Sequence, residues 1–232
     1  MTHPEQLVLD LPTRPALGRE AFFVAPANRL ALALVDSWPA WPGGRLAVTG
    51  PEGAGKTHLA HVWAARAGAR LVAARNVATL DLATLPGDAA VAVEDVDRLA
   101  ALRTRRAAAE EALFHLCNHL AGGGGSLLLS GRRAPARWTI RLPDLASRLR
   151  AATVAKLEAP DDALLAALLV KHFADRQVAV APGLIDWLVS RIERSSAAAE
   201  AVVAALDRAA LAGRRPLTAR LAAEVLQSRR GS

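Results

Sequence analysis

Short, largely apolar runs alternate with helix-like patterns over the first two thirds of the chain. Apolar residues three and four positions apart predict helices at 30–38, from residue 56 onward, at 105–120 and at 142–150. The runs between them predict strands at 46–48, 69–73, 89–93, 126–130 and 153–157. No polar residue interrupts 89–93, which is typical of a parallel strand covered on both faces. The order of elements predicts an α/β domain with a parallel sheet.

After Pro160 the pattern becomes wholly helical. Pro160-Asp161-Asp162 is typical of a helix start, because acidic side chains are favoured at the positive end of the helix dipole. Apolar positions then mark four helices: Leu165, Leu168, Leu169 and Phe173; Leu184, Ile185, Leu188, Val189 and Ile192; Val202, Val203 and Leu206; Leu221 and Val225. We therefore expect a flexible or extended tail at 1–20, an α/β domain at 21–158 and a small helical domain at 159–232.

Composition narrows the cellular setting. Hydrophobic residues make up 52% of the chain, which is ample for a core, and no apolar run reaches the ~18 residues of a membrane span. The N-terminus lacks a signal-peptide pattern. The one cysteine, Cys117, lies on the apolar stripe of the 105–120 helix, which predicts a packed core thiol rather than a nucleophile. A cytoplasmic location is the default expectation.

The net charge of +7 comes almost entirely from arginine. A dedicated nucleic-acid surface typically shows basic residues gathered in a stripe with aromatic residues. The arginines of this chain are scattered instead. Direct DNA binding is therefore a less favoured interpretation than a solvated basic surface.

A phosphate-binding loop is the strongest motif. Gly50-Pro-Glu-Gly-Ala-Gly-Lys-Thr57 fits G-x-x-x-x-G-K-[ST], with a predicted strand before it and a predicted helix after it. Backbone N–H groups of such a loop and the helix N-terminus bind phosphate oxygens. Lys56 would reach the β- and γ-phosphates, and the Thr57 hydroxyl would ligate Mg²⁺. The alternative is an ordinary Gly-rich turn, but the spacing and both flanks favour nucleotide binding.

Two acids directly follow the 89–93 strand. Glu94 and Asp95 lie where P-loop enzymes hold Mg²⁺ and the attacking water, at the carboxyl end of a strand. We assign Glu94 to the metal and Asp95 to catalysis as candidates; the alternative is a solvated turn.

The tail contains a hexapeptide, Gln6-Leu-Val-Leu-Asp-Leu11, in which leucines alternate. Leu7, Leu9 and Leu11 would lie on one side of an extended chain. The pattern alone leaves two interpretations open: an edge strand of the sheet, or a docking peptide that inserts its leucines into a partner's groove.

The chain resembles the AAA+ ATPases in several features. These are the phosphate loop, the acidic pair, the hexapeptide, the helical tail, the Leu142–Leu149 segment and the stretches 191–194 and 206–208. More narrowly, the chain resembles the Hda (HdaA) family of bacterial regulators related to the replication initiator DnaA. The resemblance implies a P-loop AAA+ sheet of five parallel strands with helices on both faces, followed by an all-helical lid. It also implies that the DNA-binding domain that follows the lid in DnaA is missing, since the chain stops at Ser232.

The resemblance implies a function in DNA replication. Such proteins bind the DNA polymerase sliding clamp (β subunit) through the hexapeptide, with Gln6, Leu7, Leu9 and Leu11 as expected contacts. They promote hydrolysis of DnaA-bound ATP, the regulatory inactivation of DnaA, which turns off initiation. The implied cofactors are ATP or ADP with Mg²⁺. The expected nucleotide contacts are Asn28, Gly50, Pro51, Gly53, Ala54, Gly55, Lys56, Thr57, His58 and Arg194.

Arg148 matches the arginine finger of the family, a guanidinium presented to the nucleotide of a neighbouring subunit. Such a residue stabilises charge on the transferred phosphoryl group and contributes ~10³–10⁵ in rate. The partner would be DnaA, or another copy of this chain in a homo-oligomer. The alternative is a surface arginine paired with Asp144 or Asp161.

Three departures from the family pattern weaken the case for rapid ATP turnover. Glu94-Asp95 reverses the usual order of the two acids, Arg132 stands where DnaA relatives have an acid, and Ala197 stands where the lid carries a nucleotide-sensing arginine. Arg194, nearly one turn earlier, is the candidate substitute. We therefore expect an ADP-held nucleotide switch, at most a weak ATPase by itself, whose catalytic effect is exerted in trans on DnaA. The alternatives are a self-sufficient oligomeric AAA+ ATPase and a DnaA-like adaptor that binds DNA directly.

Overall fold

The computed structural model describes residues 22–213 and 215–230. The chain forms two compact units that divide between residues 161 and 162, whereas the sequence predicted a boundary after residue 158. The predicted docking hexapeptide, with Gln6, Leu7, Leu9 and Leu11, lies outside the described residues.

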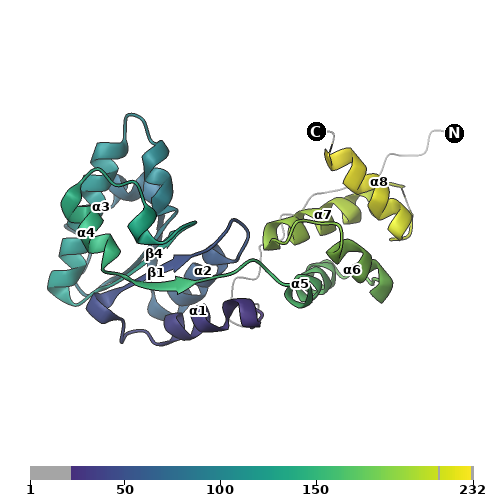
Figure 1. The fold of residues 1–232 in the computed structure, drawn as a ribbon, viewed down its shortest axis with the longest axis horizontal. Helices are drawn as coiled ribbons and strands as arrows, with labels where there is room; N and C mark the ends of the chain where they lie inside the picture. The colour runs from purple at the N-terminus through teal and green to yellow at the C-terminus, as the bar shows by residue number, and fades with distance from the viewer. Residues whose placement is uncertain (1–21, 214, 231–232) are drawn as a thin grey trace. The chain divides into compact units, whose positions relative to one another are not determined.

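The first unit is built on a five-stranded, wholly parallel sheet (Figure 1). Its strands are β1 (Arg45–Thr49), β2 (Arg70–Ala73), β3 (Ala90–Glu94), β4 (Ser126–Gly131) and β5 (Thr153–Lys156). The strand order is β2-β3-β4-β1-β5. The loop that follows β1 therefore leaves the sheet beside the end of β4, and the end of β3 lies one strand further along the same edge.

Helices cover both faces of this sheet. They are α1 (Pro26–Asp36), α2 (Lys56–Ala67), α3 (Arg106–Gly123) and α4 (Pro143–Arg150), with short 3₁₀ helices η2 (Pro42–Gly44), η3 (Ala74–Thr79), η4 (Val96–Ala101) and η5 (Pro135–Arg137). Because successive strand residues point to opposite faces, Val91 and Val93 pack with α3 and α4, while Ala92 packs with α1 and α2. All of these strand side chains are fully buried. The arrangement confirms the predicted α/β fold class.

Cys117 lies in the core between α3 and the sheet, as predicted from the apolar stripe. Its side chain is 1% exposed. Burial raises the pKa of the Cys117 thiol to about 11, so the thiolate that would act as a nucleophile is disfavoured.

Helix α1 begins earlier and ends earlier than the predicted 30–38. Pro26 occupies the first helical position, where its missing N–H costs nothing. Asn28 helps fix this start, because its Oδ1 accepts the N–H of Ala25 at 2.8 Å. At the other end the chain turns after Asp36, and Trp38 donates its indole N–H to Ser126 Oγ at 2.9 Å. Periodicity continued through Trp38 in sequence, but this side chain anchors a turn instead of a helix.

The second unit is entirely helical, as predicted. It consists of α5 (Asp162–Asp175), α6 (Pro182–Val189), α7 (Ser196–Gly213) and α8 (Ala219–Arg230). Its core contains every apolar position that the sequence singled out in this region, either fully buried or packed at the margin. Ser195 caps α7, since its Oγ accepts the N–H of Ala198 at 3.0 Å.

No helix within 22–213 and 215–230 combines the length and apolar composition that a bilayer crossing requires.

Candidate functional site

The loop between β1 and α2 is shaped to present backbone N–H groups. Gly55 has a left-handed backbone, φ +95°, which a residue with a Cβ adopts only with strain, and it places Lys56 at the first position of α2. Ala54 donates its N–H back to Pro51 O at 3.3 Å, closing the turn. The N–H groups of Gly53, Gly55 and Lys56 donate to no acceptor within the described part of the chain. They are therefore available to an anion at the positive end of α2.

Lys56 is folded onto its own loop. Its ammonium group donates to Gly50 O at 2.9 Å and to Pro51 O at 2.7 Å, and the residue is 8% exposed. Burial lowers the pKa of Lys56 below its ordinary value, and the carboxylates of Asp95 and Asp97 partly oppose that shift. The cation is therefore held by neutral carbonyls and nearby acids, and a phosphate group would be a stronger partner for it.

The strand order brings the acidic pair to the same edge of the sheet as this loop. Asp95 has a left-handed backbone, φ +59°, which is uncommon for a residue other than glycine. Its N–H donates to Ser130 Oγ at 3.0 Å, and its carboxylate lies 3.4 Å from Arg98 Nε. The predicted catalytic carboxylate is thus already engaged by an arginine.

Glu94, the predicted metal ligand, has a different environment. Its Oε1 is buried and has no hydrogen-bond partner among the described residues. An unpaired carboxylate oxygen is costly to bury, and a cation would satisfy it. Thr57, the other predicted ligand, is exposed in the first turn of α2. A hydroxyl and a carboxylate beside a phosphate loop are a donor set that fits Mg²⁺, which completes its shell with phosphate oxygens and water.

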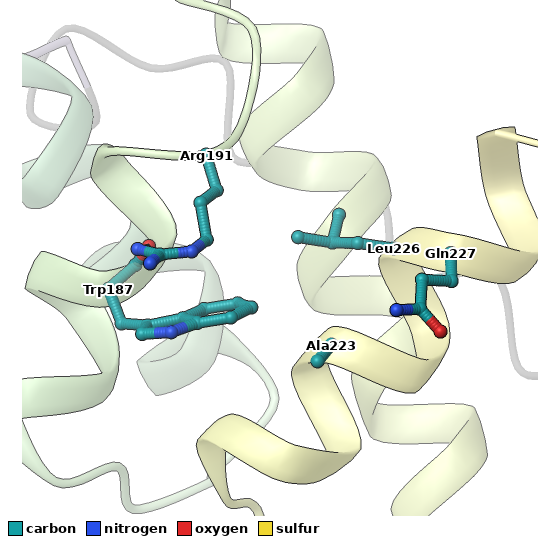
Figure 2. Close-up of a pocket in the computed structure, with 5 residues that line it drawn as sticks. All are labelled: Trp187, Arg191, Ala223, Leu226 and Gln227. Atoms are coloured by element: carbon teal, nitrogen blue, oxygen red, sulfur yellow. The ribbon is translucent and has the colours of Figure 1, made fainter.

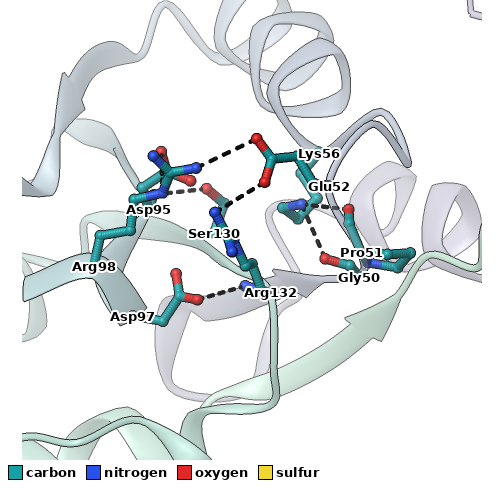
Figure 3. A network of polar contacts seen from close by, with 9 residues as sticks. All are labelled: Gly50, Pro51, Glu52, Lys56, Asp95, Asp97, Arg98, Ser130 and Arg132. Atoms are coloured by element: carbon teal, nitrogen blue, oxygen red, sulfur yellow. Dashed lines mark hydrogen bonds and ion pairs between the residues drawn. The ribbon is translucent and has the colours of Figure 1, made fainter. Parts of the chain in front are cut away.

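A chain of ion pairs links the loops that follow β1, β3 and β4 (Figure 3). Glu52, inside the phosphate loop, pairs with Arg132 at 2.9 Å and lies 3.6 Å from Arg98. The backbone N–H of Arg132 donates to Asp97 Oδ2 at 3.1 Å.

Sequence reasoning did not assign roles to Glu52, Asp97 or Arg98. One signal was available: Asp95 and Arg98 have the i,i+3 spacing at which side chains meet on a helix. Glu52 carried no such signal, because it occupies a position where the motif accepts any residue.

The segment before α1 lies against the phosphate loop. Phe22 packs edge-on to His58, with ring centroids 5.2 Å apart, and a Cβ at Gly55 would lie 3.8 Å from the Phe22 ring. The predicted nucleotide contact Asn28 uses its amide elsewhere: beyond the contact with Ala25, its Nδ2 donates to Phe23 O at 2.7 Å. In this structure Asn28 therefore organises the start of α1.

Arg148, the predicted finger, is half-buried on α4. Its guanidinium lies over the Phe114 ring of α3, 5.4 Å from the centroid, at a distance typical of a cation–π contact. It makes no ion pair with Asp144 or Asp161, the two acids of the alternative interpretation, in the described part of the chain. The entry to α4 is fixed by Glu110, whose Oε2 accepts the N–H groups of Arg141 and Leu142, each at 2.9 Å.

Arg194, the predicted lid sensor, pairs with Asp162 at 2.7 Å inside the helical unit. Both side chains are more than half exposed, so the pair is open to solvent and to exchange of partners.

The helical unit also contains a cavity of about 210 Å³ (Figure 2). Trp187, Arg191, Ala223, Leu226 and Gln227 line it. The Arg191 guanidinium carbon lies 4.3 Å from the centroid of the Trp187 ring. Figure 2 shows the guanidinium over the face of the ring. Arg191 belongs to the 191–194 stretch named above, but none of the site residues predicted from the sequence lines this cavity.

Comparisons with solved structures show which known folds this architecture resembles. No protein-family model matches the chain. Among solved structures, domain III of the replication initiation protein DnaA from Thermotoga maritima superposes with a TM-score of 0.79, at 18% identity, over 94% of this chain and 98% of that one. DnaA from Aquifex aeolicus, solved with AMPPCP bound, gives 0.66 at 18% identity, over 81% of this chain and 64% of that one.

A second group of similar structures consists of RuvB proteins. The RuvB Holliday junction branch migration motor of Thermotoga maritima gives a TM-score of 0.60 at 16% identity, over 80% of this chain and 61% of that one. At such identities the likeness concerns the fold alone. The chain has a DnaA-like AAA+ fold.

Proposed function

We propose that the chain binds a nucleoside di- or triphosphate at the Gly50–Thr57 loop. The observation that carries this proposal is the set of free N–H groups at Gly53, Gly55 and Lys56, presented at the start of α2 beside a buried ammonium group. Similar folds solved with AMPPCP bound add support. Phe22 and His58 offer an aromatic surface beside the same loop.

Mg²⁺ fits this proposal, with Thr57 and Glu94 as the protein ligands, and would supply charge neutralisation of the phosphates. Burial of Glu94 Oε1 without a partner among the described residues is the supporting observation. Asp95 would then position water only after its contact with Arg98 is released, because its Oδ2 lies 3.4 Å from Arg98 Nε. We infer at most slow hydrolysis by the chain alone.

The regulatory part of the proposal follows from the resemblance to the Hda family. The chain would dock on the sliding clamp through Gln6–Leu11 in the bacterial cytoplasm and promote hydrolysis of DnaA-bound ATP in trans, which lowers initiation of chromosomal replication. Burial of two or three leucines at ~1.5–3 kcal/mol each, less the cost of ordering an extended segment, is enough for a reversible contact. The DnaA-like fold supports this choice of partner over an unrelated ATPase.

Arg148 is the residue we propose to act on the foreign nucleotide. The α3–α4 contact holds its guanidinium over Phe114, and no acid of α4 neutralises it in the described chain. A guanidinium kept without a carboxylate partner retains its capacity to bind a phosphoryl group.

The decisive experiment measures hydrolysis of DnaA-bound ATP in the presence of DNA-loaded clamp. We expect stimulation by the wild type, loss of clamp binding by Leu7→Ala/Leu9→Ala, and loss of stimulation with intact clamp and nucleotide binding by Arg148→Ala. Arg150→Ala, on the exposed side of the same helix, is the matched control and should keep full stimulation. Stimulation by Arg148→Ala equal to wild type would contradict the finger assignment.

Two further measurements separate the alternatives. Rapid multiple-turnover hydrolysis by the chain alone would favour a self-sufficient ATPase. Salt-dependent binding to duplex DNA without clamp would favour a DNA-binding adaptor.

A further inference from the structure

Glu52 is the one acidic residue of the phosphate loop, and its carboxylate is shared between two guanidinium groups. Oε2 lies 2.9 Å from Arg132 Nη2, and Oε1 lies 3.6 Å from Arg98 Nη2. Arg132 directly follows β4 and Arg98 belongs to η4, the 3₁₀ helix that follows β3. One carboxylate therefore connects the three loops at the carboxyl edge of the sheet, as the dashed contacts in Figure 3 show.

Other contacts hold the two arginines at this edge independently of Glu52. Arg98 Nε lies 3.4 Å from the carboxylate of Asp95, and the backbone N–H of Arg132 donates to Asp97. Removal of the Glu52 charge would therefore leave the Arg98 guanidinium beside Asp95 and the backbone of Arg132 in place at the same edge. The two guanidinium groups would become available to another anion that arrives there.

The Glu52 contacts are also easy to exchange. Its side chain is 69% exposed, and those of Arg132 and Arg98 are about half exposed. Ion pairs in such surroundings are weak, because water and salt compete for both partners. A terminal phosphate carries more charge and more acceptor oxygens than a carboxylate, and guanidinium groups bind it at least as well.

The number of phosphates decides whether this competition occurs. In a phosphate loop the backbone N–H groups and the lysine cradle the β- and γ-phosphates, and the γ-phosphate is the one nearest the groups that act on the attacking water after the neighbouring strand. Here that neighbouring edge carries Arg98 and Arg132. A third phosphate at this edge would meet the Glu52 charge and compete for the same two arginines, whereas a diphosphate lacks that group.

We propose that Glu52 is a specificity-determining residue that competes with the third phosphate for Arg98 and Arg132, and so biases the loop toward a nucleoside diphosphate. The inference rests on the proposed nucleotide site. It adds that the resting ligand is set by a side chain of the loop itself, at a position that the motif leaves free.

The test is calorimetric measurement of Kd for MgADP and for the Mg²⁺ complex of a non-hydrolysable ATP analogue, on the full chain. We expect Glu52→Gln to tighten binding of the ATP analogue about three- to tenfold, the effect of one or two exposed ion pairs. The Kd for ADP should change less than about twofold, because the diphosphate does not contact the released arginines. Glu111→Gln is the matched control: this side chain of α3 is 71% exposed, and within the described residues its ion pair is with His115.

A double-mutant cycle identifies the route. In an Arg98→Ala/Arg132→Ala background, Glu52→Gln should no longer change the ratio of the two Kd values. Equal tightening of both nucleotides, or a persisting effect without the arginines, would show general electrostatics and overturn the inference. Unchanged affinities in Glu52→Gln, with normal binding by wild type, would overturn it while the nucleotide site stands. If wild type binds neither nucleotide, the proposed function and this inference both fall.

Discussion

Glu110 is a buried carboxylate whose three hydrogen bonds fix the position of α4. It is 2% exposed; Oε1 accepts Arg106 Nε at 2.7 Å, and Oε2 accepts two backbone N–H groups. Burial alone would raise the pKa of Glu110, but the hydrogen bonds from Arg106, Leu142 and Arg141 outweigh it and hold the pKa below its ordinary value. This carboxylate therefore stabilises the fold at neutral pH, and its contribution is lost as the pH falls through its lowered pKa.

We predict that Glu110→Ala destabilises the α/β unit by about 3–5 kcal/mol, because it leaves the Arg106 charge buried without a carboxylate partner. Denaturant unfolding of the full chain measures the change. Glu111→Ala, one residue further on the exposed side of α3, should cost less than about 0.5 kcal/mol. Similar losses in the two variants would mean that the buried pair does not carry the difference.

At the scale of one element, α5 carries a histidine whose buried position disfavours its protonated form. His172 Nε2 is buried and has no hydrogen-bond partner within the described residues. Burial lowers the pKa of His172 below its ordinary value; Glu200 and Asp175 oppose this shift, while Lys171 and Arg176 add to it. Protonation is therefore easier in the unfolded chain, so this helix loses stability as the pH falls below about 6.5.

Amide hydrogen exchange tests the predicted loss of stability in α5 at low pH. It is measured on the full chain between pH 7.5 and 5.5 and corrected for intrinsic exchange rates. We predict that the amides of α5 and α7, which pack together in the core of the helical unit, lose protection from exchange at pH 5.5. His172→Leu should remove most of that pH dependence. His115→Leu, an exposed site on α3, serves as the control and should leave it in place. Protection in α5 that is independent of pH in the wild type would refute the assignment.

At the scale of the whole molecule, ligand binding and folding are linked through the α/β unit. All the loop residues that would hold phosphate, Lys56 among them, belong to that unit. Anything that binds the folded loop alone stabilises the fold by mass action.

We predict that MgADP at 100 times its Kd stabilises the α/β unit by about 2.7 kcal/mol. The increase should appear as slower exchange in β1, β4 and α2. Lys56→Met should abolish the effect, because it removes the ammonium group at the centre of the site. His61→Gln, further along α2, is the control and should respond like wild type. Equal stabilisation of Lys56→Met would place the ligand elsewhere.

Much of this molecule was predictable from local pattern. The strands appear close to their predicted bounds, because a parallel strand covered on both faces must be apolar throughout, and Val91, Ala92 and Val93 are fully buried. Cys117 was predicted to be buried for a similar reason. The end of α1 was mispredicted because Trp38 fits a helical period but hydrogen-bonds to Ser126, which is distant in sequence.

The candidate site likewise has a part that the sequence predicts and a part that it does not. The Gly50–Thr57 motif is local, because adjacent residues in one turn supply the N–H groups, so its letters were enough to find it. The competition at Glu52 depends on Arg98 and Arg132, which the strand order β3-β4-β1 brings beside the loop. The sequence by itself determined which segments form strands, helices and the phosphate loop, since those depend on neighbours along the chain. Only the tertiary structure decided which charges meet at the sheet edge, since that depends on how the strands pair.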